Sequence, residues 1–246
     1  MVRTRLDRVL VARGLVATRS RARDLITRGH VTVDGVAVVK PGLEIGDNAQ
    51  IALSDTAAQF VSRGALKLSA ALAHFRYRAS GVTALDIGAS TGGFTQVLLE
   101  AGAQRVYAID VGRGQIDRSL LDDPRVISLE GTDARTLTIE QIAEPVGAVV
   151  ADVSFISLKK ALPVPLSFAS PGAWLVALIK PQFEAGREAV GKGGIVRDPV
   201  DRERAVSVVR EWLASQPGWS VDGVIESPLL GGSGNQEFLI GARKDG

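Results

Sequence analysis

The stretch Thr83-Ala-Leu-Asp-Ile-Gly-Ala-Ser-Thr-Gly-Gly-Phe-Thr95 decides the fold of this chain. Residues 83–87 are an apolar run around one acid, which is typical of a buried strand. Gly88 then permits backbone conformations that a Cβ forbids, and the glycines at 92 and 93 let the chain approach a ligand closely before a helix begins. The stretch therefore predicts a cofactor site at a turn between a strand and a helix.

The glycine spacing and two acids indicate which cofactor binds. A dinucleotide site uses Gly-x-Gly-x-x-Gly, whereas this turn reads Gly88-x-x-x-Gly92-Gly93 after Asp86, a carboxylate that repels a pyrophosphate but can hold a cation, directly or through water. A second strand, 105–109, is followed by Asp110, which lies 22 residues after Gly88 (110 − 88) and can accept both hydroxyls of an adenosine ribose. The pattern favours S-adenosylmethionine over NAD, with a doubly wound domain whose loop binds nothing as the alternative.

Further strands predict an open α/β sheet. They alternate with helical segments, as parallel strands with crossover helices require, and cover residues 125–129, 146–151 and 173–179. Ligands in such sheets bind at the carboxyl ends of the strands, so Asp86, Asp110, Asp152 and Lys180 are expected on one rim, with Asp152 and Lys180 as neighbours. Residues 184–199 are expected to form a flexible loop over that rim.

The predicted cofactor residues extend along this rim. Asp133 and the Ala134 amide follow the third strand, where they can meet an adenine edge. The full predicted set is Asp86, Gly88, Ala89, Ser90, Thr91, Gly92, Gly93, Phe94, Asp110, Asp133, Ala134 and Asp152.

Composition narrows the function classes. The chain has 246 residues, no cysteine, no apolar run near the roughly 18 residues of a membrane span and no signal-peptide pattern, so we expect a cytoplasmic protein without disulfides. Residues 1–30 contain eight arginines against two aspartates, a charge of +6, while the whole chain carries +2, so the remainder carries −4. A local basic segment on a nearly neutral chain indicates nucleic-acid binding, and a solvated helix face is the alternative.

The basic segment predicts a small separate domain. Two short helices end near Gly14 and Gly29, the second capped by Thr18, and an Asp34-Gly35 hairpin and a strand at 50–53 follow. We expect a small α+β domain over residues 1–55, a linker over 56–62 and the large domain over 63–246.

Residues 3–53 resemble the alpha-L RNA-binding motif found in a small-subunit ribosomal protein and in many pseudouridine synthases. The resemblance lies in Arg-Leu-Asp-Arg-Val-Leu from Arg5, Thr-Arg-Ser-Arg-Ala from Thr18 and Gly29-His-Val-Thr-Val-Asp-Gly35. It implies that the basic helices grip the backbone of structured RNA, because arginine's planar donor fork suits phosphate oxygens. The predicted RNA-binding residues are Arg3, Arg5, Arg19, Arg21, Arg23, Lys40 and Arg63.

Two features that the chain lacks narrow the classes of methyl acceptor. Carbon methylation of cytosine needs a thiolate, which a chain without cysteine does not have. Methylation of an exocyclic amine usually uses an Asn/Asp-Pro-Pro-aromatic turn, and here that turn reads Asp152-Val-Ser-Phe155. An oxygen acceptor remains, for which a base must be poised near neutral pH, and the available polar residues are Lys67, Asp152, Lys180 and Glu237. Lys67 also has a simple reading as a snorkelling surface lysine.

These four residues resemble the Lys-Asp-Lys-Glu tetrad of the FtsJ/RrmJ-type ribose 2′-O-methyltransferases. Together with the N-terminal motif, the chain from about residue 3 to 243 resembles the TlyA (haemolysin A-like) family. Matching segments include Ser62-Arg-Gly-Ala-Leu-Lys67, Leu178-Ile-Lys-Pro-Gln-Phe-Glu184 and Gly234-Asn-Gln-Glu237. The resemblance implies a Rossmann-like class I methyltransferase sheet, mostly parallel with an antiparallel last strand.

The resemblance also implies a function and residue roles. It implies S-adenosylmethionine-dependent methylation of the ribose 2′-hydroxyl of cytidine in 16S ribosomal RNA, 23S ribosomal RNA or both, without a metal because the sulfonium is already activated. Lys180 would act as base or steer the hydroxyl, Asp152 would orient Lys180, and Lys67 and Glu237 would complete the network. A membrane-active haemolysin and a catalytically silent, RNA-binding ribosome assembly factor are the alternatives.

Overall fold

The computed structural model describes residues 3–16, 18–27, 29–53, 60–231 and 234–246. It divides into two compact units, Met1–Ser62 and Arg63–Gly246, each with its own core. Most of the predicted linker, residues 56–59, lies outside the described residues.

The first unit is a small α+β domain. Its elements are β1 (Arg3–Arg5), α1 (Leu6–Ala12), α2 (Arg19–Thr27), β2 (Val31–Val33), β3 (Val36–Val38), β4 (Glu44–Gly46) and β5 (Ile51–Leu53). The strands form an antiparallel sheet of order β3-β2-β5 and a β1-β4 pair. The predicted hairpin is confirmed, with φ of 52° at Asp34 and 80° at Gly35, and Thr18 Oγ1 accepts the Arg21 amide at 3.2 Å as the predicted helix cap.

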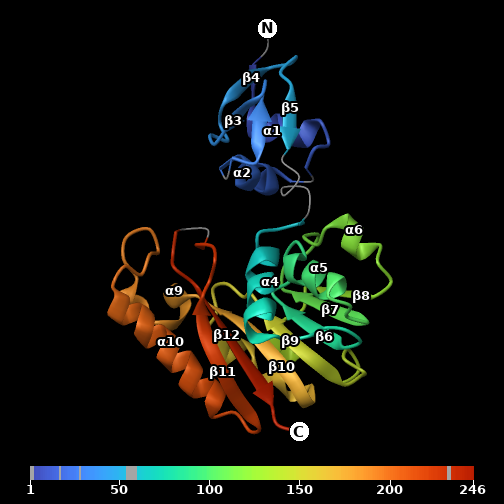
Figure 1. The fold of residues 1–246 in the computed structure, drawn as a ribbon, viewed down its shortest axis with the longest axis vertical. Coiled ribbons are helices and arrows are strands. Elements are labelled where there is room, and N and C mark those ends of the chain that lie inside the picture. The colour runs from blue at the N-terminus through green and yellow to red at the C-terminus, as the bar shows by residue number, and fades with distance from the viewer. Residues whose placement is uncertain (1–2, 17, 28, 54–59, 232–233) are drawn as a thin grey trace. The chain divides into compact units, whose positions relative to one another are not determined.

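The second unit contains a seven-stranded sheet of order β11-β12-β10-β9-β6-β7-β8 (Figure 1). Its strands are β6 (Thr83–Ile87), β7 (Arg105–Asp110), β8 (Val126–Glu130), β9 (Val146–Ala151), β10 (Ala169–Ile179), β11 (Trp219–Glu226) and β12 (Phe238–Lys244). The central pairs are parallel, while β12 runs antiparallel to both β10 and β11. The mostly parallel sheet with an antiparallel last strand is therefore confirmed.

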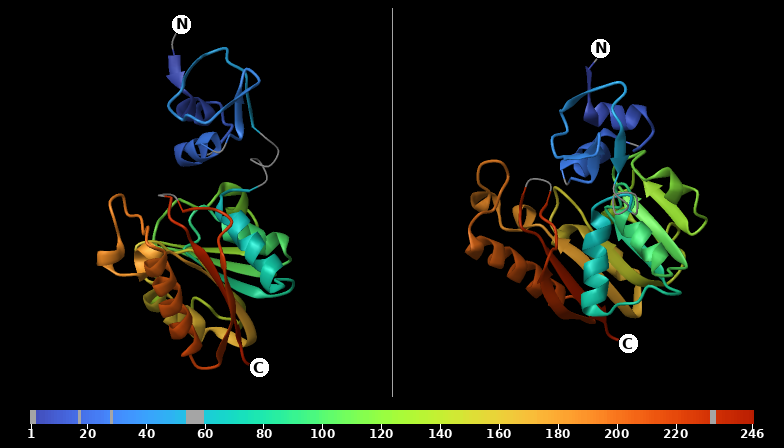
Figure 2. Two further views of the ribbon diagram at one scale, coloured as in Figure 1. Left: turned by 60° about the vertical axis from the view of Figure 1, so that its left-hand side comes forward. Right: turned by 45° about the horizontal axis from the view of Figure 1, so that its top comes forward.

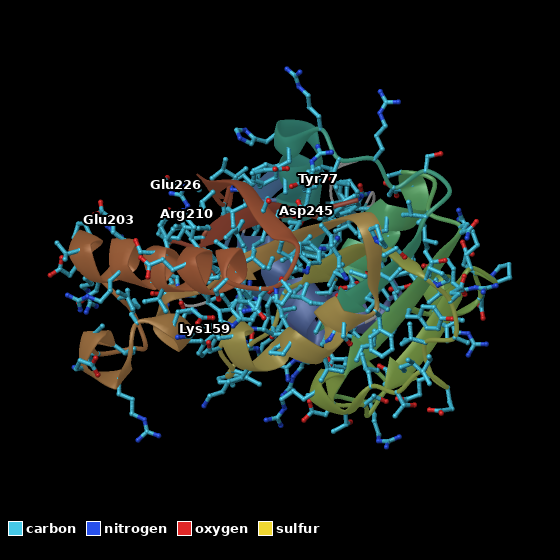
Figure 3. All side chains as sticks on the ribbon, turned by 90° about the horizontal axis from the view of Figure 1, so that it is seen from below. Tyr77, Lys159, Glu203, Arg210, Glu226 and Asp245 are labelled. Atoms are coloured by element: carbon cyan, nitrogen blue, oxygen red, sulfur yellow. The ribbon has the colours of Figure 1, made fainter. Side chains whose placement is uncertain are left out.

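Helices cover both faces of this sheet (Figures 1 and 2). On one face, α4 (Gly64–Phe75) packs against α5 (Gly93–Glu100). The other face is covered by α7 (Leu158–Ala161), α8 (Pro163–Ser167) and α10 (Pro199–Ala214), whose leucines share a core with Leu85 and Ile87. Short elements complete the unit: α6 (Arg118–Leu121), η1 (Ala134–Thr136), α9 (Pro181–Glu184) and η2 (Arg187–Ala189). Glu203 and Arg210 mark the outer side of α10 (Figure 3).

The buried side of α4 differs from the one expected from its leucines. The sequence predicts an apolar stripe that includes Leu66, Leu68, Leu72 and Phe75, but Leu66 is 40% exposed. The residues buried on α4 are Ala65, Lys67, Leu68, Ala71 and Phe75. Two alanines on this side let the helix lie close to its neighbours, and Lys67 is buried because it has an acidic partner.

Candidate active site

The turn between β6 and α5 is shaped by Gly88. Its φ is +83°, and a Cβ at this position would lie 2.7 Å from the backbone oxygen of Asp152. Backbone cannot move aside as a flexible side chain can, so only glycine fits here. The turn thus packs directly against the end of β9.

A cleft of about 930 Å³ lies at the carboxyl edge of the sheet. Six of the predicted cofactor residues line it, namely Gly88, Ser90, Asp110, Asp133, Ala134 and Asp152. The other six do not line it, namely Asp86, Ala89, Thr91, Gly92, Gly93 and Phe94. These form the half-buried or buried shell behind the cleft wall.

Asp110 is fixed in the cleft by two backbone amides. Its carboxylate accepts the Ser90 amide at 2.8 Å and the Gly112 amide at 2.7 Å. Each carboxylate oxygen has two lone pairs, so both retain an acceptor site for a ribose hydroxyl. The Ser90 hydroxyl also donates to Gln115 at 3.1 Å, and Gln115 is a cleft residue that the sequence does not predict.

Asp133 is already engaged by its neighbour Arg135. Its carboxylate accepts both side-chain and backbone hydrogen bonds from Arg135, at 2.6 to 3.0 Å. These hydrogen bonds lower the pKa of Asp133. A ligand at this end of the cleft therefore meets an ionised carboxylate that it shares with an arginine.

Asp86 lies beneath the cleft. It is 0% exposed, its Oδ2 accepts the Thr95 hydroxyl at 2.7 Å, and its Oδ1 has no hydrogen-bond partner within the described residues. Burial raises its pKa to about 7, the charges of Asp152 and Asp110 add to this, and the Thr95 hydrogen bond opposes it. A cationic ligand above Asp86 would favour the ionised carboxylate.

The four polar residues of the predicted tetrad form two ion pairs. Lys67 Nζ donates to Glu237 Oε2 at 2.5 Å, and both residues are buried. Lys180 Nζ lies 2.7 Å from Asp152 Oδ1, which confirms that these two are neighbours. Lys180 Nζ donates a hydrogen bond to Ser154 Oγ at 2.8 Å, whereas its contact with Asp152 Oδ1 is an ion pair without hydrogen-bond geometry.

The two ion pairs lie at the same edge of the sheet. Ile179 of β10 is paired with Phe238 of β12, so Lys180 and Glu237 are the next residues beyond that pair. Residues directly opposite each other on antiparallel strands have Cβ atoms about 5 Å apart. Lys67, on α4, reaches this edge through Glu237, and Asp152 reaches it from the end of β9.

Phe155 lines the cleft, and the sequence does not predict that its side chain is exposed there. It is 91% exposed, although large apolar side chains usually avoid water, and its φ of +66° is rare outside glycine. Its ring lies 5.3 Å from that of Phe183, and both rings line the cleft. Phe155 stands in the Asp152-Val-Ser-Phe155 motif, but its exposure depends on a backbone conformation that the motif does not specify.

The predicted RNA-binding residues fall in both units. Exposed side chains on the first unit are Arg3, Arg5, Arg19, Arg23 and Lys40, whereas Arg21 is half-buried. Arg5 and Arg19 are brought together because both contact Asp7. Arg63 belongs to the second unit and is half-buried at the start of α4.

No helix in the described ranges is both long enough and apolar enough to cross a membrane.

Known proteins similar to the chain reproduce this two-part organisation. The profile of the FtsJ-like methyltransferases matches residues 60–244, and that of the S4 domain matches residues 4–51. The chain is 48% identical over 242 residues to the 16S/23S rRNA (cytidine-2′-O)-methyltransferase TlyA of Mycobacterium tuberculosis, covering 98% of this chain and 90% of that protein. It is 39% identical over 236 residues to Hemolysin A of Brachyspira hyodysenteriae, covering 96% and 98% of the two chains.

A solved structure agrees over the whole length. A protein of Streptococcus thermophilus, provisionally named a hemolysin, matches with a TM-score of 0.77 at 39% identity, covering 100% of this chain and 90% of that one.

Proposed function

This chain belongs to the FtsJ-like methyltransferase family, in the group with an N-terminal S4 domain, and we propose that it methylates the ribose 2′-hydroxyl of cytidine in ribosomal RNA. The observation that carries the proposal is the Lys180–Asp152 ion pair beside the cofactor cleft, with the buried Lys67–Glu237 pair at the same edge. The relative with this specificity covers nearly the whole chain.

The cleft fits S-adenosylmethionine as the methyl donor. Asp110 keeps lone pairs that can accept ribose hydroxyls, Gly88 keeps the wall free of a side chain, and the buried Oδ1 of Asp86 has no hydrogen-bond partner within the described residues. Carboxylates without a partner in a dry site favour a cationic ligand. When bound, this donor supplies an activated methyl group on a sulfonium, so no metal is needed.

Lys180 is the residue we assign to the reacting hydroxyl. Its ammonium has three N–H donors, of which one is used on Ser154, while its charge pairs with Asp152 without a hydrogen bond, so a donor is left for the ribose oxygen. The ammonium would steer the ribose oxygen, and the hydroxyl proton would pass to a lone pair of the Asp152 carboxylate as the oxygen bonds the methyl carbon and the donor's carbon–sulfur bond breaks. Lys67 and Glu237 keep this edge of the sheet rigid and hold the ribose beside Lys180.

The test is removal of the Lys180 amine. In the Lys180→Ala variant, methyl transfer to ribosomal RNA should fall at least about a hundredfold, because general acid–base groups contribute about 10²- to 10⁴-fold. Binding of S-adenosylmethionine and of RNA should change little. Titration calorimetry and incorporation of labelled methyl groups measure the two effects.

The matched control is Lys159→Ala. Lys159 is an exposed lysine on α7 that does not line the cleft (Figure 3). This control should retain full activity. Near-normal turnover by Lys180→Ala would contradict the assigned role.

With ribosomal RNA as its substrate, we propose that the protein acts in the cytoplasm, in contact with ribosomal subunits or their RNA. Mapping 2′-O-methylated riboses in ribosomal RNA from cells with and without the gene would identify the nucleotide and the subunit. Loss of one cytidine 2′-O-methyl group in cells without the gene is the expected result.

A membrane activity is the second candidate, because similar proteins carry the hemolysin name. Release of dye from liposomes by the purified protein would support it. We expect no release, because the profile of the FtsJ-like methyltransferases accounts for residues 60–244.

A further inference from the structure

Asp7 is a buried carboxylate in the arginine-rich unit. It lies in the first turn of α1 and its side chain is 0% exposed. Arg5 of β1 donates to it through Nε and Nη2, each at 3.1 Å, and Arg19 at the start of α2 donates through Nη2 at 2.9 Å. Asp7 thus contacts arginines from two different elements, and these two arginines are 14 residues apart (19 − 5) in the chain.

The geometry fixes both guanidinium groups at the surface. An unpaired buried carboxylate is costly, so the two arginines are needed to keep Asp7 inside. Their own side chains remain 43% and 50% exposed. Of five N–H donors each, Arg5 uses two on Asp7 and Arg19 uses one, and the exposed heads present others to solvent.

Hydrogen bonds from Arg5 and Arg19 hold the pKa of Asp7 at about 2, although burial opposes them. The carboxylate therefore stays ionised at every pH at which the protein would meet RNA, and the arrangement of the two arginines does not change with pH in that range.

We propose that Asp7 is a positioning residue that holds Arg5 and Arg19 as a two-guanidinium clamp for neighbouring phosphate groups of ribosomal RNA. The inference rests on the proposed function, since it takes ribosomal RNA as the ligand. A planar guanidinium held in one orientation loses little rotamer freedom when it binds a phosphate oxygen. Asp7 itself touches no RNA and acts through the arginines.

This role predicts an effect opposite to that of net charge. Removing an acid from a basic surface should strengthen RNA binding if only charge matters, because phosphate contacts dominate affinity. If Asp7 positions the arginines, its removal should weaken binding instead. The sign of the change therefore separates the two explanations.

The experiment measures binding of the full chain to a labelled ribosomal RNA fragment by fluorescence anisotropy, at several salt concentrations. Asp7→Asn should bind about tenfold more weakly, within the usual range for coupled residues. The control is Asp47→Asn, the same charge change at an exposed acid of this unit, and it should bind equally or slightly more tightly. Equal or tighter binding by Asp7→Asn would overturn the inference.

A second background separates positioning from misfolding. In Arg5→Gln/Arg19→Gln, RNA binding should already be weak, and adding Asp7→Asn should change it less than twofold, because the arginines through which Asp7 acts are absent. A further large loss in this background would mean that Asp7 supports the fold, and the inference would fail. Such a result leaves the proposed methylation untouched, whereas wild-type protein that neither binds nor methylates ribosomal RNA would refute both.

Discussion

Asp86 shows how a single residue of the sheet is tuned by its surroundings. One carboxylate oxygen accepts the Thr95 hydroxyl of α5, and the other has no hydrogen-bond partner within the described residues. Desolvation disfavours its charged form, which is why its pKa rises to about 7. The carboxyl is therefore poised to lose a proton when a cationic ligand binds above it.

The ligand-free protein should lose stability at Asp86 as the pH rises from about 4 towards about 7. In this window the Asp86 carboxyl has released its proton in the unfolded chain, where its pKa is near 3.8, but retains it in the folded protein. Rising pH therefore stabilises the unfolded state relative to the folded state. Above pH 7 the penalty is constant, at about 1.4 kcal/mol per pKa unit. In Asp86→Asn the penalty is absent, so its stability relative to wild type should rise across the window in urea unfolding at four pH values. Parallel pH profiles of the two proteins would contradict this.

The sequence predicts the positions of some site residues but not of others. Asp110 and Asp152 follow recognisable strands, so their place on the rim follows from chain direction alone. Arg135 and Gln115 enter the cleft through local turns, and Phe155 through a left-handed backbone conformation. Side-chain direction in such segments depends on tertiary contacts that no periodic pattern encodes.

At the scale of elements, Glu184 ties α9 to the beginning of α7. Its carboxylate accepts the Ser157 hydroxyl at 2.6 Å and the Leu158 amide at 2.7 Å. Lys180 immediately precedes α9, and the segment 152–157 carries Asp152. Glu184 thus joins the two chain segments that supply the Lys180–Asp152 pair, and burial raises its pKa.

Glu184→Gln should therefore slow methyl transfer without changing the affinity for S-adenosylmethionine. The amide accepts through one oxygen only and carries no charge, so the Ser157 hydroxyl has to turn and accept from the amide NH2, both contacts weaken and the two segments can shift. Since small misplacements are costly in catalysis, we expect kcat to fall about tenfold. Single-turnover kinetics and calorimetry provide the two readouts. The control Glu188→Gln, at an exposed acid of η2, should behave as wild type, and equal kcat in both variants would argue against the tie.

The segment 184–199, expected as a flexible loop, contains structure of its own. It includes η2 and a bridge between Gly191 and Ile195. Asn235 accepts the Val196 amide at 2.9 Å and donates to the Gly194 carbonyl at 2.8 Å. Asn235 lies about 40 positions further along the chain than the residues it binds, so the glycines within the segment do not predict these contacts.

Two prolines between the end of β9 and the middle of β10 occupy positions that suit proline. Pro163 is at the first position of α8, where a missing N–H has no helical partner to lose. Pro171 lies at an irregularity of β10, between its register positions Ala169 and Trp174. Proline is tolerated at the start of a helix and at an irregularity of a strand because neither position needs its N–H.

For the whole molecule, the separate cores of the two units predict separable functions. A chain shortened to residues 57–246 retains the sheet, the cleft and both ion pairs. It should bind S-adenosylmethionine within about twofold of the full chain, but methylate ribosomal RNA at least about tenfold less efficiently, because it lacks the phosphate contacts of the arginine-rich unit. Calorimetry and kcat/KM for RNA test this. Unchanged kcat/KM would show that the first unit does not deliver the substrate.

The sequence by itself determined the order of the elements, the strand-turn-helix around Gly88, the two-unit organisation and the identity of the acids and lysines at strand ends. These follow from local patterns and chain direction, which act over a few residues. The tertiary structure decided which of these side chains meet: Lys67 with Glu237, 170 positions apart, and Asp7 with two arginines. A buried charge is tolerated when an opposite charge lies beside it. In these pairs the opposite charge comes from another element, so the packing of the elements decides whether the pair forms.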